Sequence, residues 1–370
     1  MSIARTAETA PQRELLEKAR GGDEGAFGHL VEPYRGQLHA HCYRMLGSVH
    51  DAEDAVQEAL LRAWRGLSRF ESRSSLRSWL YRIATNASLD AIGRRKRVLP
   101  VDHVPATDPG DGPGEPLAET VWLEPYPDEM LALEDDPAAP EARYEQREAV
   151  ELAFVATLQH LPPQQRAALI MREVLGFTAK EVGESLETTV ASVNSALQRA
   201  RKTVDERLPA HSQQETLRSL GDERMREIVE AYMDAMERGD VKAVVDMLAE
   251  DAAWSMPPLA AWFGGLDAIE VFLRRGPLTG EWRWRHLPTR VSGQAASAVY
   301  SWDEERQTHL PFALDVLTLE GDRIKDITAF VTRSIEGRDR DFYARWPAQA
   351  NDPARVAAFF ESFGLPDRVD

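Results

Sequence analysis

The stretch "LGFTAKEVGESLETTVASVNSALQRARKTV" at residues 175–204 decides how the middle of the chain folds. Its apolar positions predict a short helix at 178–186, a tight turn at Glu187 and Thr188, and a second helix from about Thr189. This order is typical of a helix-turn-helix, whose second helix can enter the major groove of DNA. The apolar side chains expected to meet across the turn are Val182, Leu186, Val190, Val193 and Leu197.

Short polar side chains occupy the second helix outside its apolar stripe. Hydroxyl, amide and guanidinium groups at these positions suit hydrogen bonds to base edges and phosphates. An ordinary helical hairpin with a polar solvent face stays open as the alternative on spacing alone. The candidate DNA-contacting residues are Thr188, Thr189, Ser192, Asn194, Ser195, Gln198 and Arg199.

A second helix with a divided surface is predicted at "DAEDAVQEALLRAW", residues 51–64. Its acidic side comprises Asp51, Asp54 and Glu58, and two interpretations of that side stay open. In one interpretation the carboxylates only stabilise the first turn of the helix, with Asp51 as the N-cap. In the other they bind a basic partner. The apolar side comprises Ala52, Val56, Ala59, Leu60, Ala63 and Leu67.

Charge is unevenly spread along the chain, whose net charge is −17. Residues 27–97 carry a net charge of +5, whereas residues 98–147 carry −11. The asymmetry predicts a basic working surface followed by an acidic connector that repels phosphate or shields the basic surface. A nucleic-acid-binding role is therefore compatible with an acidic protein.

Composition indicates a protein of two or three domains, because 370 residues exceed the usual size of one core. The N-terminus shows no hydrophobic signal region and no apolar run approaches membrane-spanning length, which predicts a cytoplasmic protein. The single cysteine, Cys42, is expected to be a buried thiol. No metal site and no cofactor are predicted.

The pattern along the chain predicts helical blocks first and an α+β domain last. Two amphipathic helices at 222–249 break at Gly239, and Gly321-Asp322 joins two strand patterns as a hairpin. Within the connector, "VWLEPYPDEML" is expected to pack on a neighbouring domain. The predicted divisions are a helical domain at 12–97, a proline-rich acidic linker at 98–147, a helix-turn-helix domain at 148–208, an α+β domain at 222–335 and a tail at 336–370.

These motifs resemble those of the sigma-70 family, in its extracytoplasmic-function group. The matching stretches are "DAEDAVQEALLRAW", "FESRSSLRSWLYRIATNASLDAIGRRKR" and "LPPQQRAALIMREVLGFTAKEVGESL" with "VNSALQRAR", which cover most of the first 205 residues. The last block resembles a SnoaL-like domain of the NTF2 superfamily. The combination is similar to actinobacterial sigma factors of the sigma G and sigma J type, and "WLEPYPDEML" with "FGLPDR" favours the sigma G side.

The resemblance implies a subunit of RNA polymerase that directs promoter-specific initiation. It implies two all-α sigma domains, a helical bundle and a helix-turn-helix domain, followed by an α+β NTF2-like cone. Sigma domain 2 would read and melt the −10 element, and sigma domain 4 would read the −35 element. The linker would thread towards the polymerase active site. The implied −10 residues are Glu71, Arg73, Ser74, Arg77, Arg82, Asn86, Arg94 and Arg95.

Polymerase contacts follow from the same resemblance. The β′ clamp helices would meet Asp51, Asp54, Gln57 and Glu58, and the β flap is a further expected contact. Complementary charge would speed this association and fix its register. One departure is Glu187, which stands where many relatives have glycine, so a left-handed turn there would cost about 1 kcal/mol.

The NTF2-like domain leaves three functions open. It regulates the sigma domains or the linker, with or without a small ligand, so that no anti-sigma factor is required; it is a cyclase- or isomerase-type enzyme; or it recruits another protein. No catalytic residue is assigned, although an enzyme of this fold would need an acid/base group, for which Asp251, His286, Asp315 and Asp326 are the candidates. The candidate pocket comprises Trp254, Trp262, His286 and Asp315.

Overall fold

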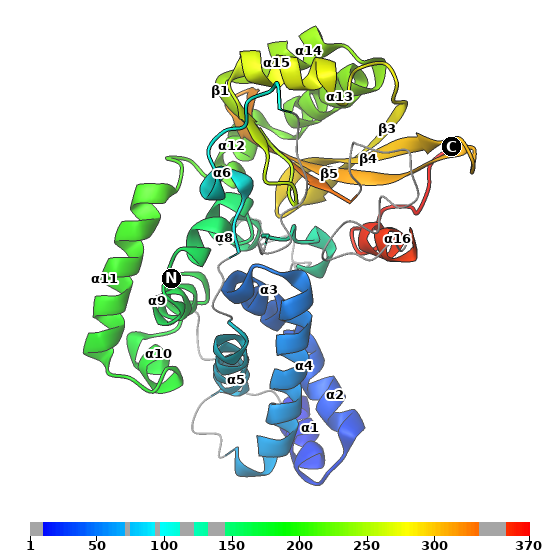
Figure 1. Ribbon diagram of the computed structural model, residues 1–370. Helices are drawn as coiled ribbons and strands as arrows, with labels where there is room; N and C mark the ends of the chain where they lie inside the picture. The colour runs from blue at the N-terminus through cyan, green and yellow to red at the C-terminus, as the bar shows by residue number, and fades with distance from the viewer. Residues whose placement is uncertain (1–9, 71–74, 93–96, 112–121, 132–144, 333–352) are drawn as a thin grey trace. The chain divides into compact units, whose positions relative to one another are not determined.

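The computed structural model describes residues 10–70, 75–92, 97–111, 122–131, 145–332 and 353–370. The chain forms two compact units (Figure 1). The helical unit comprises Met1–Lys96 and Met130–Pro209, and the sheet unit comprises Arg97–Glu129 and Ala210–Asp370. This division confirms helical domains followed by a domain that contains a sheet.

The first half of the helical unit is a bundle in which α3, α4 and α5 pack on one another. Helix α4 begins after Ser48, whose hydroxyl accepts the backbone N–H of Asp51 at 3.0 Å, so the prediction of Asp51 as N-cap is wrong. All six predicted apolar positions are buried, as expected, five of them in α4 and Leu67 in the turn that follows it. The elements are α1 (Ala10–Arg20), α2 (Glu24–Val31), η1 (Glu32–Tyr34), α3 (Arg35–Leu46), α4 (Val49–Gly66), η2 (Leu67–Arg69) and α5 (Leu76–Ala91).

The second half of the unit contains the helix-turn-helix. Thr178 begins α10 with a reciprocal capping box to Glu181, and Thr189 begins α11 by accepting the N–H of Ser192. The predicted helices are therefore confirmed to within one residue at their starts. The elements are α8 (Leu152–Gln159), α9 (Pro163–Leu169), the π-helical turn η4 (Ile170–Val174), α10 (Ala179–Ser185) and α11 (Val190–Arg207).

The turn between α10 and α11 is tight and strained. Glu187 adopts a left-handed conformation with φ of 52°, so the turn keeps positive φ at a cost of about 1 kcal/mol. The Thr188 N–H donates to the Gly183 carbonyl at 2.8 Å. A Cβ at Gly183 would lie 3.0 Å from the Thr188 carbonyl oxygen, so the close approach requires glycine.

The sheet unit is built on six strands in the order β2-β1-β6-β5-β4-β3. Strands β1 and β6 are parallel, and the other neighbours are antiparallel. Helices α13, α14 and α15 cover one face of the sheet, and the apolar core lies between them and the strands (Figure 1). The strands are β1 (Leu248–Ser255), β2 (Trp262–Gly264), β3 (Trp284–Val291), β4 (Gln294–Asp303), β5 (Thr308–Glu320) and β6 (Arg323–Val331).

Two turns predicted from glycines in the sequence are present in the sheet unit. Gly239 ends α13 in a left-handed conformation with φ of 66°, and Gly321-Asp322 forms the predicted hairpin between β5 and β6. The expected helix to residue 249 is too long, because β1 begins at Leu248. The helices are α6 (Pro100–His103), η3 (Asp128–Met130), α12 (Gln213–Leu220), α13 (Asp222–Arg238), α14 (Val241–Asp246), α15 (Leu266–Arg275) and α16 (Pro353–Glu361).

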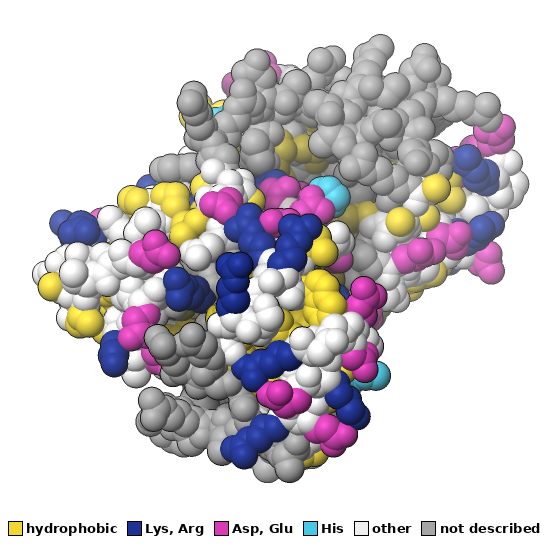
Figure 2. All heavy atoms as spheres, turned by 90° about the horizontal axis from the view of Figure 1, so that it is seen from below, with side chains coloured by type: hydrophobic (Ala, Val, Ile, Leu, Met, Phe, Trp, Pro, Cys, Tyr) yellow, Lys and Arg dark blue, Asp and Glu magenta, His cyan; other side chains and the backbone are white. Residues whose placement is uncertain are grey.

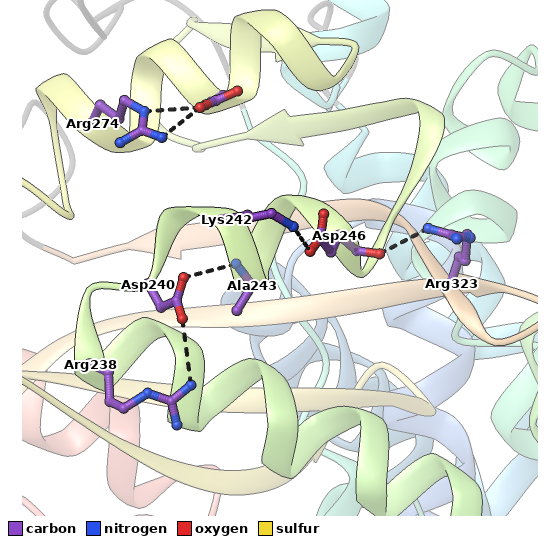
Figure 3. Close-up of polar contacts among 8 residues, drawn as sticks. Arg238, Asp240, Lys242, Ala243, Asp246, Arg274 and Arg323 are labelled. Carbon is purple, nitrogen blue, oxygen red and sulfur yellow. Dashed lines mark hydrogen bonds and ion pairs between the residues drawn. The ribbon is translucent and has the colours of Figure 1, made fainter.

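Polar contacts hold the corner between α13 and α14 (Figure 3). Asp240 caps α14 by accepting the Ala243 N–H at 3.0 Å, and its other oxygen lies 3.8 Å from Arg238. Arg323 of β6 donates to the Asp246 carbonyl at 2.9 Å, which ties the corner to the sheet. No helix within the described residues is long and apolar enough to cross a bilayer.

Candidate nucleic-acid and polymerase interface

The acidic face of α4 is open to solvent at its centre. Asp54 and Gln57 are exposed, and Asp51 and Glu58 are partly exposed. Glu58 forms an ion pair of 2.7 Å with Arg62, whose other nitrogen meets Asp90 of α5 at 2.7 Å. The four predicted residues therefore lie together on one helix, as the periodicity requires.

An exposed leucine lies on the same face and was missed by the sequence analysis. Leu61 is 50% exposed and follows Asp54 and Gln57 on the surface at helical spacing of seven and four residues. Nothing in the periodicity of α4 separates it from an ordinary surface leucine. Its place among carboxylates makes the face a charged surface with an apolar centre, the usual composition of a protein interface.

Arg77, a predicted −10 residue on α5, contacts the other half of the helical unit. Its guanidinium donates to the Leu175 carbonyl at 3.2 Å and lies 4.8 Å from the centre of the Phe177 ring. It also lies 4.9 Å from the Tyr81 ring. Each ring face attracts the cation, so Arg77 joins α5 to the segment before the helix-turn-helix.

Arg82 makes a second contact of this kind. Its guanidinium lies 3.4 Å from the carboxylate of Glu187, the strained residue of the turn. Asn86, one helical turn further on, is partly exposed. Figure 2 shows Lys and Arg side chains gathered near the middle of the helical unit's face. The other predicted −10 residues lie outside the described residues: Glu71, Arg73, Ser74, Arg94 and Arg95.

A buried polar seam joins α3 to α8 and α9. Arg166 donates to the Gln159 side chain at 2.7 Å and to the Met45 carbonyl, and burial lowers its pKa to about 10. The Arg44 side chain donates to the Ala149 carbonyl at 2.9 Å. Buried guanidinium groups need such acceptors, so the seam holds the two halves in one arrangement.

The recognition helix α11 presents its predicted residues to solvent. Thr189, Ser192, Asn194, Ser195, Gln198 and Arg199 are exposed, and Thr188 is partly exposed. Asn194 and Gln198 line a surface groove of about 550 Å³ beside Arg172, whereas Ser192, Ser195 and Arg199 follow the other side of the helix. The expectation that Val190 packs across the turn is wrong, because its side chain is 45% exposed.

In the sheet unit, three of the four candidate pocket residues surround one tyrosine. Tyr232 donates its hydroxyl to the Asp315 carboxylate at 2.7 Å, and its ring lies 6.2 Å from His286 and 6.4 Å from Trp254. Sequence reasoning missed Tyr232, although a hydroxyl on the apolar side of α13 is the signal that marks it. The fourth residue, Trp262, lies elsewhere.

Burial shifts the ionisation of this cluster. It raises the pKa of Asp315 to about 7 and holds the pKa of Tyr232 well above its usual range. Burial lowers the pKa of His286 to about 3, so that the imidazole is neutral, with one nitrogen 2.9 Å from the Ser297 hydroxyl. The other two acid/base candidates lie outside this cluster. Asp251 pairs with Lys325 at the surface, and burial raises the pKa of Asp326 to about 6.

Trp262 instead contacts the connector between the helical halves. Its indole N–H donates to the Val104 carbonyl at 2.8 Å, and its own carbonyl accepts the Thr107 N–H at 2.8 Å. The connector thus runs along β2 of the sheet unit before it reaches the aromatic segment that begins at Trp122.

That aromatic segment packs on the β3–β4 turn, as the sequence led us to expect. Tyr126 and Ser292 are joined by two hydrogen bonds: the Ser292 N–H donates to the Tyr126 carbonyl at 2.8 Å, and the Tyr126 N–H donates to the Ser292 side-chain hydroxyl at 2.9 Å. Asp128 accepts the Gly293 N–H at 2.7 Å. Leu123 and Tyr126 are almost fully buried, so they anchor the segment.

Comparison with known families and proteins assigns each part of this arrangement. Residues 30–98 match sigma-70 region 2, residues 151–204 match sigma-70 region 4, and residues 229–327 match a SnoaL-like domain. The ECF RNA polymerase sigma factor SigG of Mycobacterium tuberculosis is 41% identical over 360 residues, 96% of this chain and 87% of the relative. The chain belongs to the ECF RNA polymerase sigma factors.

Other relatives agree with this membership. The sigma factor SigW of Bacillus subtilis is 30% identical over 200 residues, which cover 53% of this chain and 96% of the relative. The crystal structure of the M. tuberculosis sigma factor SigJ has the same fold, with a TM-score of 0.50, 24% identity and coverage of 81% of this chain and 95% of that one. This sigma factor is therefore a promoter-specific transcription initiation factor that acts with core RNA polymerase, and not an enzyme.

Proposed function

We propose that this sigma factor uses three surfaces, one for core polymerase and two for promoter DNA. The acidic face of α4 binds the basic clamp helices of the polymerase β′ subunit, and region 4 also meets the β flap. Helix α5, with the flanking residues 71–74 and 93–96, reads and melts the −10 element. Helix α11 reads the −35 element in the major groove. Working as a polymerase subunit, the protein acts in the cytoplasm.

Promoter binding then requires the contacts within the helical unit to open. Arg77 and Arg82 are directed at phosphates and bases in the proposed role, whereas here they bind Leu175, Phe177 and Glu187. The same guanidinium groups cannot hold both partners at once. The exposed Arg82 pair is worth about 0–1 kcal/mol, so it is readily exchanged for a phosphate.

The SnoaL-like domain regulates the factor by holding the linker. The observation that carries this proposal is that residues 97–129 form one compact unit with residues 210–370. Fully extended, this segment would span about 110 Å. While the sheet unit holds it, that length is not available to the linker that connects regions 2 and 4. Release of the segment would let the two regions separate on the polymerase. This control requires no anti-sigma factor.

Loosening the linker tests this proposal. Tyr126→Ala removes a fully buried anchor, and Ser292→Ala removes the hydroxyl that accepts its N–H. Both variants are expected to raise the rate of promoter-specific transcription by core polymerase, with the larger effect from Tyr126→Ala. Multi-round run-off transcription at limiting sigma factor measures the rate.

A matched control changes the same linker without touching an anchor. Val101→Ala alters an exposed side chain of α6 and should leave transcription at the wild-type rate. Circular dichroism checks that each variant keeps its fold. If Ser292→Ala and Tyr126→Ala, both folded, transcribe at or below the wild-type rate, linker capture is not inhibitory.

A further inference from the structure

One large apolar side chain of the helix-turn-helix is exposed to solvent. Among the described residues, the exposed large hydrophobic side chains are Leu61, Val101 and Val190. Val190 is 45% exposed, although it is the first residue of α11 and lies three residues before Val193, where the buried side of the helix begins. The apolar contact across the turn is made by Val193 and Leu197, which are 1% and 4% exposed.

The local backbone holds Val190 in a defined position. It is the first residue of α11, directly after the N-cap Thr189, whose hydroxyl accepts the Ser192 N–H at 3.1 Å. A β-branched side chain in a helix has one strongly preferred rotamer. Val190 therefore presents two methyl groups rigidly at the tip of the helix, next to the small side chain of the exposed Ala191.

The surroundings of Val190 determine what it can contact. Thr189, Ser192 and Ser195 supply hydroxyl groups on the same exposed end of the helix, and Arg199 supplies a cation one turn later. The N-terminal residues of a recognition helix are those that reach base edges in the major groove. Every group on those edges is a hydrogen-bond donor or acceptor except the C5-methyl group of thymine. A valine side chain has no other complementary group there.

We propose that Val190, supported by Ala191, reads the C5-methyl group of a thymine in the −35 element. This inference rests on the proposed function, because it assumes that α11 docks on the −35 duplex. Val190 is then a specificity-determining residue, and the neighbouring hydroxyl and amide groups read the polar edges of adjacent bases.

Removing the methyl group from DNA tests the contact directly. A −35 element is selected from a random library with holoenzyme, formed from core polymerase and the full chain. Each thymine of that element is then replaced singly by deoxyuridine, which lacks only the C5-methyl group. One replacement is expected to weaken wild-type holoenzyme binding roughly fourfold, as the loss of one buried methyl group predicts.

Variants assign the effect to the residue. Val190→Ala, which removes both γ-methyl groups, is expected to bring the affinities for the thymine and deoxyuridine duplexes close together, whereas Val190→Thr, which keeps one methyl group, should retain part of the ratio. Val101→Ala, the same change at an exposed valine outside the helix-turn-helix, should retain the fourfold ratio. Circular dichroism confirms that α11 is intact.

Several outcomes overturn the inference, and they differ from failure of the proposed function. Selection of a −35 element whose deoxyuridine duplexes all bind like the original refutes the thymine contact and leaves −35 reading intact. A fourfold ratio that persists in Val190→Ala refutes the assignment to Val190. Failure of holoenzyme to select any −35 element refutes the proposed role of α11, and the inference with it.

Discussion

Asp315 gives the sheet unit a pH-dependent stability that can be isolated by one substitution. Its pKa is raised to about 7 by burial, so the folded protein keeps a proton that the unfolded chain loses near pH 4. The stability from this group is complete below the unfolded pKa and is lost as pH rises through the folded pKa. Asp315→Asn, whose amide oxygen still accepts from Tyr232, removes that loss.

The measurement is the free energy of unfolding in urea at pH 5 and pH 7.5, followed by tryptophan fluorescence. Stability of Asp315→Asn relative to wild type should rise between these two values by about 3 kcal/mol. The comparison with wild type is needed because His286, whose pKa is lowered to about 3, makes folding more favourable as pH rises, which opposes the effect of Asp315. Asp322→Asn, in the exposed β5–β6 turn, is the control. A flat difference between pH 5 and pH 7.5 would show that Asp315 is ionised when folded.

Glu187 makes a second prediction at the scale of one residue. Its φ of 52° is strained for a side chain with a Cβ, so Glu187→Gly should stabilise the helical unit by about 1 kcal/mol. Glu187→Gln keeps the strain and loses only the ion pair with Arg82, so it separates the two effects. Thermal melts followed by circular dichroism compare the three proteins. A lower melting temperature for the glycine variant than for glutamine would contradict the strain argument.

At the scale of an element, α4 is the clearest test of polymerase binding. Charge reversal by Asp54→Lys with Glu58→Lys should weaken core binding about tenfold or more, because a basic partner then meets like charge. Leu61→Ala should weaken binding by removing the apolar centre of the face. Fluorescence anisotropy of labelled sigma factor titrated with core polymerase gives the dissociation constants.

The control lies in the sheet unit. Glu223→Lys with Glu230→Lys makes the same change of net charge at two exposed residues of α13 and should leave core binding unchanged. Loss of helicity in the α4 double variant would attribute the effect to folding instead. Equal weakening by the α13 double variant would mean that net charge, and not the acidic face of α4, governs association.

The helices of the helical unit could be predicted well from the sequence. The period of the apolar residues places α4, α10 and α11, because each helix buries one side and shows the other to water. The same period failed at Val190, since a side chain at the end of a helix loses its neighbour where the turn bends away. It also failed at Leu248, where a helical pattern meets a strand with no glycine or proline between them.

At the scale of the whole molecule, contacts between distant segments lay beyond sequence reasoning. The Ser292 N–H bond to the Tyr126 carbonyl, and the Arg166 bond to the Met45 carbonyl, each depend on backbone atoms that almost every residue carries. Trp262 was predicted to line the pocket, whereas its indole N–H donates to the Val104 carbonyl of the linker. The predicted −10 residues that lie outside the described residues remain predictions, as do the domain boundaries.

Run-off transcription with purified core polymerase tests the central claim most directly. The template carries a promoter selected by the holoenzyme, and a scrambled −35 and −10 template is the control. We predict one transcript of defined start that requires both the full chain and the selected promoter. A transcript of equal yield from core polymerase alone, or from the scrambled template, would contradict the assignment of promoter recognition to this chain.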